Sequence, residues 1–343
     1  MRTARFARFF LVAILFLATL SPMNAQESKL LSDKPGTFKL VDWGVYTHYN
    51  CGFTKAETTA NYQELIKLTD AVRRNSVIGN PKGFDCQAVV YSQNCDIAEG
   101  YGIPCQISFE FRSWSMKNGK AIQWTVEPPS WSIYVNNLKT FAGSGFNFSS
   151  YPPSDMAAGF DLKPWENATR KVNQLFYQPG KKESIGRGVD RYNGETVIVF
   201  NPGRPAYWIP VTIREAFSQV FAYWKLNPDR IASEMVLKEL QKEYDKFTET
   251  EREGFAYDGD PGSISGIGSD NRELPLMKVN PLYWDKSLPR SSIQILGFYC
   301  PADKESVRNE GEVQLKNNQG ECYLNRFIES LDVNILAGSV LVK

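Results

Sequence analysis

The chain has 343 residues, of which 42% are hydrophobic and 22% charged, and its formal net charge is +1. This composition is typical of a folded globular protein and argues against an intrinsically disordered one. A near-neutral charge without a block of Lys and Arg also argues against a nucleic-acid partner, which requires a basic face.

The first 25 residues have the three parts of a secretory signal peptide. Arg2, Arg5 and Arg8 form a positive region, an apolar run follows over 9–20, and small residues lead up to Ala25. The run is too short to span a bilayer, so we expect cleavage and no integral membrane segment afterwards. The expected location is the periplasm, the extracellular space or the lumen of the secretory pathway.

The next part of the chain, residues 26–142, has the pattern of an N-terminal α+β unit. Residues 55–74 have apolar positions at helical spacing, and Thr54 and Glu57 match the Thr-x-x-Glu capping box. The sequence therefore predicts a helix that begins directly after Thr54.

Alternating apolar and polar residues follow this helix and predict an antiparallel meander. The strands are expected near 107–111, 122–126 and 131–135. Asn118 and Gly119 separate the first two of these strands, and Asn-Gly is the strongest short signal for a hairpin turn.

A stretch rich in Gly, Ser and Pro over 143–164 indicates a loop or linker. The C-terminal α+β unit covers 165–343 and could form a single domain with the first unit. Its predicted helices are 165–177 and two that follow caps at Thr212 and Asn227. Its predicted strands are 196–200, 207–211, 293–298, 313–315 and 331–341.

The grouping of strands and helices, without regular alternation, favours the α+β class. We expect an antiparallel sheet or meander packed with helices and stabilised by disulfides, because an exported chain with an even number of cysteines favours that chemistry. Proximity in sequence suggests a bridge between Cys300 and Cys322. The six cysteines are Cys51, Cys86, Cys95, Cys105, Cys300 and Cys322.

The sequence contains no recognisable catalytic signature. Its one histidine is His48, so it offers no histidine pair for a metal and only one candidate base for a nucleophile such as Cys51. The near match to a nucleophile elbow, 262–266, has Ile264 where the serine must be. No phosphate-binding loop occurs, and we expect no cofactor.

A loop over 254–275 is rich in glycine and aspartate and makes Asp258 and Asp260 weak candidates for calcium ligands. The EF-hand pattern fails because Gly262 stands at the position of a ligand. Turn formation explains the same composition without an ion, so the favoured prediction is that no metal binds.

Tyrosine and tryptophan are adjacent at several positions near prolines and loops. Such pairs can stack on sugar rings or anchor a protein partner. The candidate ligand-binding residues are Tyr207, Trp208, Tyr283 and Trp284.

These residues and the missing catalytic signatures favour a non-enzymatic protein that binds an extracytoplasmic glycan or an envelope protein. One alternative is a secreted hydrolase of glycan or peptide that uses carboxylates and needs no histidine. The other alternative is a structural component of the cell envelope.

Overall fold

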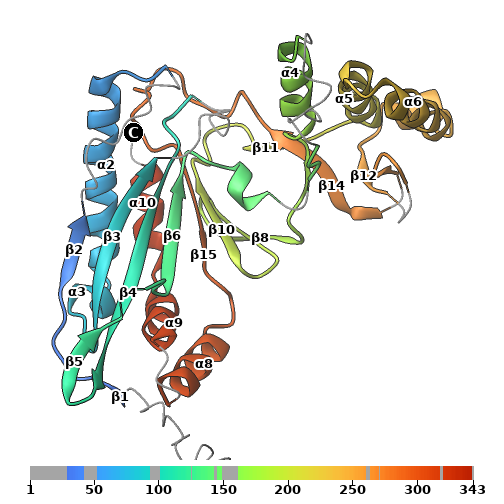
Figure 1. The fold of residues 1–343 in the computed structure, drawn as a ribbon. Helices are drawn as coiled ribbons and strands as arrows, with labels where there is room; N and C mark the ends of the chain where they lie inside the picture. Colours follow the sequence, from blue (N-terminus) through green and yellow to red (C-terminus); the bar gives the residue numbers. More distant parts are fainter. Residues whose placement is uncertain are drawn as a thin grey trace, which may run out of the picture.

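The computed structural model describes residues 29–41, 52–92, 101–124, 126–142, 145–148, 161–259, 263–269, 271–316 and 320–341. Two sheets and the helices packed around them make up this part of the chain, so the predicted α+β class is confirmed (Figure 1). None of the helices described is long and apolar enough to cross a membrane. The predicted signal peptide and His48 lie outside the described residues.

The larger sheet has ten strands, of which eight follow the order β2-β3-β4-β6-β15-β10-β9-β8. The remaining two, β1 and β5, both pair with β4. Only the pair β2–β3 is parallel within this sheet as described. Strands from both sides of the segment 143–164 therefore share one sheet. The strands are β1 Lys29–Leu30, β2 Phe38–Val41, β3 Phe84–Ser92, β4 Cys105–Lys117, β5 Lys120–Gln123, β6 Ser130–Val135, β8 Lys182–Gly186, β9 Val189–Tyr192, β10 Thr196–Phe200 and β15 Ile295–Tyr299.

The three strands predicted for the meander are present and antiparallel as β4, β5 and β6. However, β6 pairs with β4 and β15, so the described strands form a hairpin whose first strand also pairs with the third, and not a meander. Asn118 and Gly119 both have positive φ, at 52° and 73°, which is the backbone of a type I′ hairpin turn. The long strand β4 pairs with β5 near this turn and with β6 further away from it. Along one edge of β4, the residues near the turn therefore pair with β5, and the residues near Cys105 pair with β6.

Helices cover one face of the large sheet. They are α2 Lys55–Arg73, α3 Ser76–Gly79, α8 Lys304–Lys316, α9 Glu321–Ser330 and α10 Val333–Leu341. The capping box that the sequence predicts at the start of α2 is present, with Thr54 accepting from the Glu57 N–H and Glu57 accepting from the Thr54 N–H. It satisfies backbone donors that the first turn of a helix leaves without intrahelical partners.

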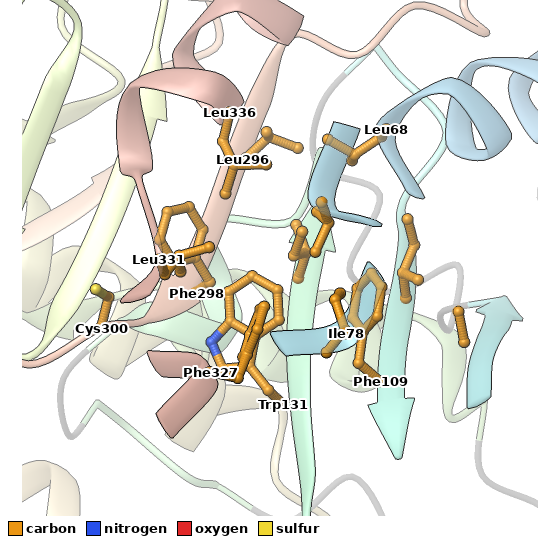
Figure 2. Close-up of a cluster of buried hydrophobic side chains, with 14 of the residues drawn as sticks. Leu68, Ile78, Phe109, Trp131, Leu296, Phe298, Cys300, Phe327, Leu331 and Leu336 are labelled. Atoms are coloured by element: carbon orange, nitrogen blue, oxygen red, sulfur yellow. The ribbon is translucent and has the colours of Figure 1, made fainter. Parts of the chain in front are cut away.

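The main core lies between these helices and the sheet (Figure 2). Trp131 of β6 is at its centre, with ring centroids 5.0 Å from Phe327 of α9 and 5.5 Å from Phe298 of β15. The Trp131 Nε1–H donates to the carbonyl of Tyr299 at 2.7 Å, so the indole is buried without an unsatisfied donor.

A smaller five-stranded sheet carries its own helices. Its strands are β7 Phe176–Tyr177, β11 Trp208–Pro210, β12 Tyr257–Asp258, β13 Ile267–Gly268 and β14 Asn271–Val279. The helices of this region are α4 Lys163–Val172, α5 Ile213–Leu226, α6 Arg230–Tyr244 and α7 Glu249–Arg252, and a short 3-10 turn, η3, covers Lys139–Phe141. Figure 1 shows this group beside the end of the large sheet that carries β8 and β10.

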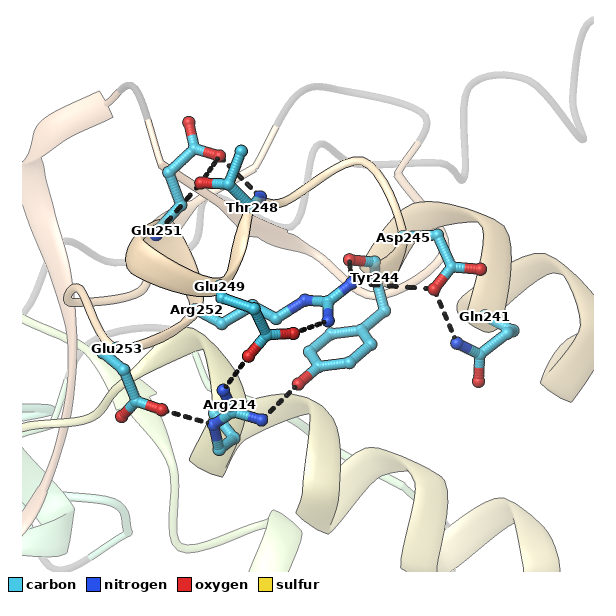
Figure 3. A network of polar contacts seen from close by, with 9 residues as sticks. All are labelled: Arg214, Gln241, Tyr244, Asp245, Thr248, Glu249, Glu251, Arg252 and Glu253. Atoms are coloured by element: carbon cyan, nitrogen blue, oxygen red, sulfur yellow. Dashed lines mark hydrogen bonds and ion pairs between the residues drawn. The ribbon is translucent and has the colours of Figure 1, made fainter.

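An ion-pair network holds the ends of α5, α6 and α7 together (Figure 3). Arg214 contacts Glu249 at 2.7 Å and Glu253 at 2.6 Å, while Arg252 contacts Glu249 at 2.5 Å and Asp245 at 3.6 Å. Because a helix of one turn is unstable on its own, α7 depends on contacts of this kind.

Two of the predicted strands are wrong. Residues 313–315 lie inside α8, and α10 occupies most of 331–341. Short apolar runs with β-branched residues do not distinguish a strand from a buried helix by periodicity alone. In the folded chain α10 packs between α2 and β10, where it buries Leu336 and Val340.

One helix cap also differs from prediction. The N-cap of α6 is Asp229, and Asn227 instead accepts from the Asp229 N–H at 2.9 Å in the preceding turn. Thr212 caps α5 as predicted by accepting from the Glu215 N–H. The sequence Thr212-Ile213-Arg214-Glu215 also matches a capping box, but only the Thr212 half is formed, because the Glu215 carboxylate contacts Lys278 at 2.5 Å.

Candidate functional site: an open polar face of the large sheet

The four aromatic residues that the sequence suggests for ligand binding are part of a core. Tyr207, Trp208, Tyr283 and Trp284 are 3%, 4%, 1% and 5% exposed. They belong to one cluster that fills the space between the two sheets. The expectation of exposed rings is therefore corrected: the large sheet is covered here on both faces, by helices on one and by the smaller sheet on the other.

Burial also determines the chemistry of these tyrosines. Desolvation raises the pKa of Tyr207 far above its ordinary value, and it raises the pKa of Tyr192 and Tyr283 as well. The phenols stay protonated, so they act as hydrogen-bond donors inside the core and not as bases.

The four cysteines of the described residues are free and buried, and no disulfide is seen among these residues. The suggested bridge between Cys300 and Cys322 is accordingly absent from the structure, while Cys51 and Cys95 lie outside the described ranges. Desolvation raises the pKa of Cys86 and Cys300, and that of Cys322 to about 11. Protonated thiols of this kind are poor nucleophiles.

The loop suggested for calcium is ordered by a protein side chain. The Glu243 carboxylate accepts hydrogen bonds from the Ile264 N–H at 2.7 Å, the Ser265 N–H at 3.0 Å and the Ser263 hydroxyl at 3.2 Å. Asp258 forms part of β12, and Asp260 lies outside the described residues. In the part of the chain that is described, no group of three or more His, Cys, Asp or Glu residues could hold a metal.

A hollow of about 490 Å³ lies on the face of the large sheet opposite the helices. Side chains alternate between the two faces of a strand, so Ile107 and Phe109 of β4 point into the core while Ser108 and Glu110 face the hollow. Strands β3, β4 and β6 run side by side at this place (Figure 1). The hollow is lined by Tyr91, Gln106, Ser108, Glu110, Glu127, Pro128, Ser130, Ser132 and Tyr134.

Strand register arranges these side chains in rows across the sheet. Gln106 pairs with Tyr91 on one side and with Tyr134 on the other, so two tyrosines flank an amide at one end. The next row is occupied by Val89, Ser108 and Ser132, of which Val89 is fully buried and the two serines line the hollow. Rows on one face of a sheet are roughly 7 Å apart, so the short serine side chains leave a depression beside the longer tyrosine side chains. We call the serine part of this depression the floor.

The opposite end of the hollow is acidic. Glu110 pairs with Ser130 in the third row, and Glu127 stands at the rim in the connection between β5 and β6. Arg112 donates to one oxygen of Glu110 from Nε at 3.1 Å and from Nη2 at 2.7 Å. The Tyr91 hydroxyl also hydrogen-bonds to Glu110; burial and this carboxylate raise the pKa of Tyr91.

Neighbouring side chains pack against Tyr134 at the tyrosine end. The Phe141 ring packs edge-on against Tyr134, with centroids 5.2 Å apart and planes at 83°. Gly297 pairs with Tyr134 across the sheet, and a Cβ at this glycine would overlap the Phe141 ring. The hollow is thus shaped before any ligand arrives, which lowers the entropic cost of binding.

This arrangement offers hydroxyl, amide and carboxylate groups on a preformed surface with aromatic rings at one end. Gln106 already donates to the Ser132 hydroxyl at 2.9 Å, so the floor groups are oriented by one another. These groups hydrogen-bond to polar ligands, and no described cysteine or histidine contributes to the lining.

The comparisons with known proteins give no family for this chain. It matches no protein-family model, no curated protein and no solved structure. The sequence alone did not identify the hollow, although it contains one signal for it. The alternation of Ser108, Glu110 and Arg112 marks a polar strand face, but that face becomes a site only where β3 and β6 supply the tyrosines.

Proposed function

We propose that this protein is an exported, non-enzymatic binding protein and that its ligand is a glycan held in the hollow over β3, β4 and β6. The observation that supports this most directly is the polar, preformed lining with Tyr91 and Tyr134 at one end. Sugars are bound by dense hydrogen bonding together with stacking on aromatic rings, and this lining offers both.

The export part of the proposal depends on the signal-like N-terminus. An extracytoplasmic location would give the hollow access to envelope or extracellular glycans.

The rival function, a carboxylate-dependent hydrolase, is less well supported at this site. A glycosidase needs one carboxyl group that stays protonated and a second that is free to act as nucleophile or base. Glu110 already accepts hydrogen bonds from Arg112 and from Tyr91, so the protein's own donors engage it. If Glu127 acted as one of the two catalytic carboxyl groups, the hollow would offer no free second carboxyl group among its described lining residues.

Calorimetric titration with oligosaccharides tests the proposal. The mature protein is titrated with tetrasaccharides of glucose, N-acetylglucosamine and glucosamine. We expect saturable binding of at least one of them, and Ser132→Trp should abolish it by filling the floor. Ser184→Trp is the matched control, because it places the same ring on the exposed edge strand β8.

Two results would contradict this function. If Ser132→Trp bound the sugar as well as the wild-type protein does, the ligand would bind outside the hollow. If none of the three tetrasaccharides bound, the proposal that the ligand is a glycan would be contradicted. Chromatography of the same mixtures decides the enzymatic question, since a binder leaves the tetrasaccharide intact and a hydrolase shortens it.

A further inference from the structure

The two acidic residues of the hollow differ in their ion pairs. The Glu110 carboxylate is 15% exposed and its charge is compensated by Arg112. Glu127 is exposed at the rim, and among the described residues no side chain forms an ion pair or hydrogen bond with its carboxylate. Among the described residues that line the hollow, Glu127 thus carries a negative charge without an ion-pair partner at the acidic end.

The backbone at Glu127 is unusual as well. Its φ is +44°, in the left-handed region that residues other than glycine rarely adopt. The next residue is Pro128, and a proline disfavours helical conformations at the residue before it. Strained backbone of this kind is often found at ligand sites, where it holds a side chain in a required place.

We infer that the ligand carries a protonated amino group that binds to Glu127, so that the preferred glycan contains a free amino sugar. This inference rests on the proposed function, because it concerns the ligand of the same hollow. The serines and Gln106 would bind hydroxyl groups of the sugar, and the two tyrosines would contact its ring faces. The amino group would then lie at the acidic end.

Two tetrasaccharides that differ in one group test this inference. Glucosamine tetramer and N-acetylglucosamine tetramer share the same linkage, but only the first is cationic at about pH 6. We expect the wild-type protein to bind the amine form about two- to fivefold more tightly, which is the strength of an exposed ion pair. The preference should shrink as salt is added, because salt screens exposed charges.

Substitutions of Glu127 test whether its carboxylate causes the preference for the amine form of the sugar. Glu127→Gln should remove most of the preference for the amine and leave the affinity for the acetylated sugar nearly unchanged. Glu127→Gly should do the same and also fold well, because glycine adopts positive φ without strain. Glu234→Gln, on the exposed side of α6, is the matched control for loss of one negative charge.

The outcomes separate the inference from the proposed function. Equal binding of both sugars by the wild-type protein, or an amine preference that survives in Glu127→Gln, overturns the inference and leaves glycan binding in place. Failure of both sugars and of the glucose tetramer to bind overturns the proposed function and the inference together.

Discussion

The hydroxyl of Tyr207 donates a 2.6 Å hydrogen bond to the carboxylate of Asp190, which is only 2% exposed. Asp190 belongs to β9 of the large sheet, whereas Tyr207 directly precedes β11 of the smaller one. The Lys182 ammonium group lies 2.8 Å from the same carboxylate. A buried charge is stable only when it is paired and hydrogen-bonded, so this contact links the two sheets.

Tyr207→Phe should therefore destabilise the protein by about 1–3 kcal/mol, because it leaves one lone pair of a buried carboxylate without its donor. Tyr192→Phe is the control: the Tyr192 hydroxyl contacts the Tyr207 hydroxyl at 2.7 Å, and its loss leaves the bond to Asp190 intact. Urea unfolding measures both variants. Equal effects of the two substitutions would show that Asp190 does not depend on Tyr207.

Gly297→Ala should lower both stability and ligand binding. The added methyl group would overlap the Phe141 ring, and overpacking of this kind costs about 1–3 kcal/mol. Displacement of Phe141 would also release Tyr134 at the end of the hollow. Gly338→Ala in α10 is the control, since a Cβ there meets no atom within 4 Å and alanine favours a helix. Thermal unfolding and sugar titration of both variants test this prediction.

Stability should fall in acid partly through Glu243. Burial by itself raises the pKa of this carboxyl group, but the hydrogen bonds from Ser265, Ile264 and Ser263 together outweigh burial and hold the pKa below its ordinary value. A carboxyl group whose pKa is lowered by folding stabilises the native state above the unfolded pKa of about 4.3. This contribution is lost as the pH falls through the lower pKa of the folded state.

The measurement is urea unfolding of wild type and Glu243→Gln between about pH 7 and pH 2. We expect the variant to be less stable at neutral pH, and the difference to disappear toward the acid end. A difference that stays constant over this range would show that the carboxylate charge does not hold the loop.

The surface network of Figure 3 should respond to salt. Arg214→Met removes the contacts of Arg214 with Glu249 and Glu253, and all three side chains are exposed. We therefore expect a small decrease in the unfolding midpoint, and this decrease should vanish at high ionic strength. Arg252→Met should lower the midpoint more, because the Arg252 side chain is 16% exposed and also packs over the Tyr244 ring. A larger effect for Arg214 would contradict this order.

The four described cysteines should resist modification in the native protein. Maleimide labelling followed by peptide mass spectrometry should find them unreacted before unfolding and reactive after it, because all four thiols are buried. The sequence-based expectation of disulfides is tested by the same experiment without reductant. A linked peptide that joins Cys300 to Cys322 would contradict the free thiols of the structure.

Local features of the fold were readable from the sequence because local interactions determine them. The Thr54–Glu57 capping box and the Asn118–Gly119 turn each need only neighbouring residues. The strand predicted at 331–341 is wrong, since the apolar run there suits a strand or a buried helix equally well. Contacts with α2 and β10, far away in the sequence, make it a helix.

The sequence by itself determined the α+β class, the Asn118–Gly119 hairpin and the starts of α2 and α5, since these follow from periodicity, caps and turn residues. Only the tertiary structure decided which polar and aromatic residues face solvent. Tyr207 and Trp284 are adjacent to loops in sequence, yet they are buried because a second sheet packs over them. Tyr91 and Tyr134 are far apart in the chain, yet they flank one hollow because both pair with Gln106. Strand pairing between distant segments brings such residues together, and no local pattern encodes it.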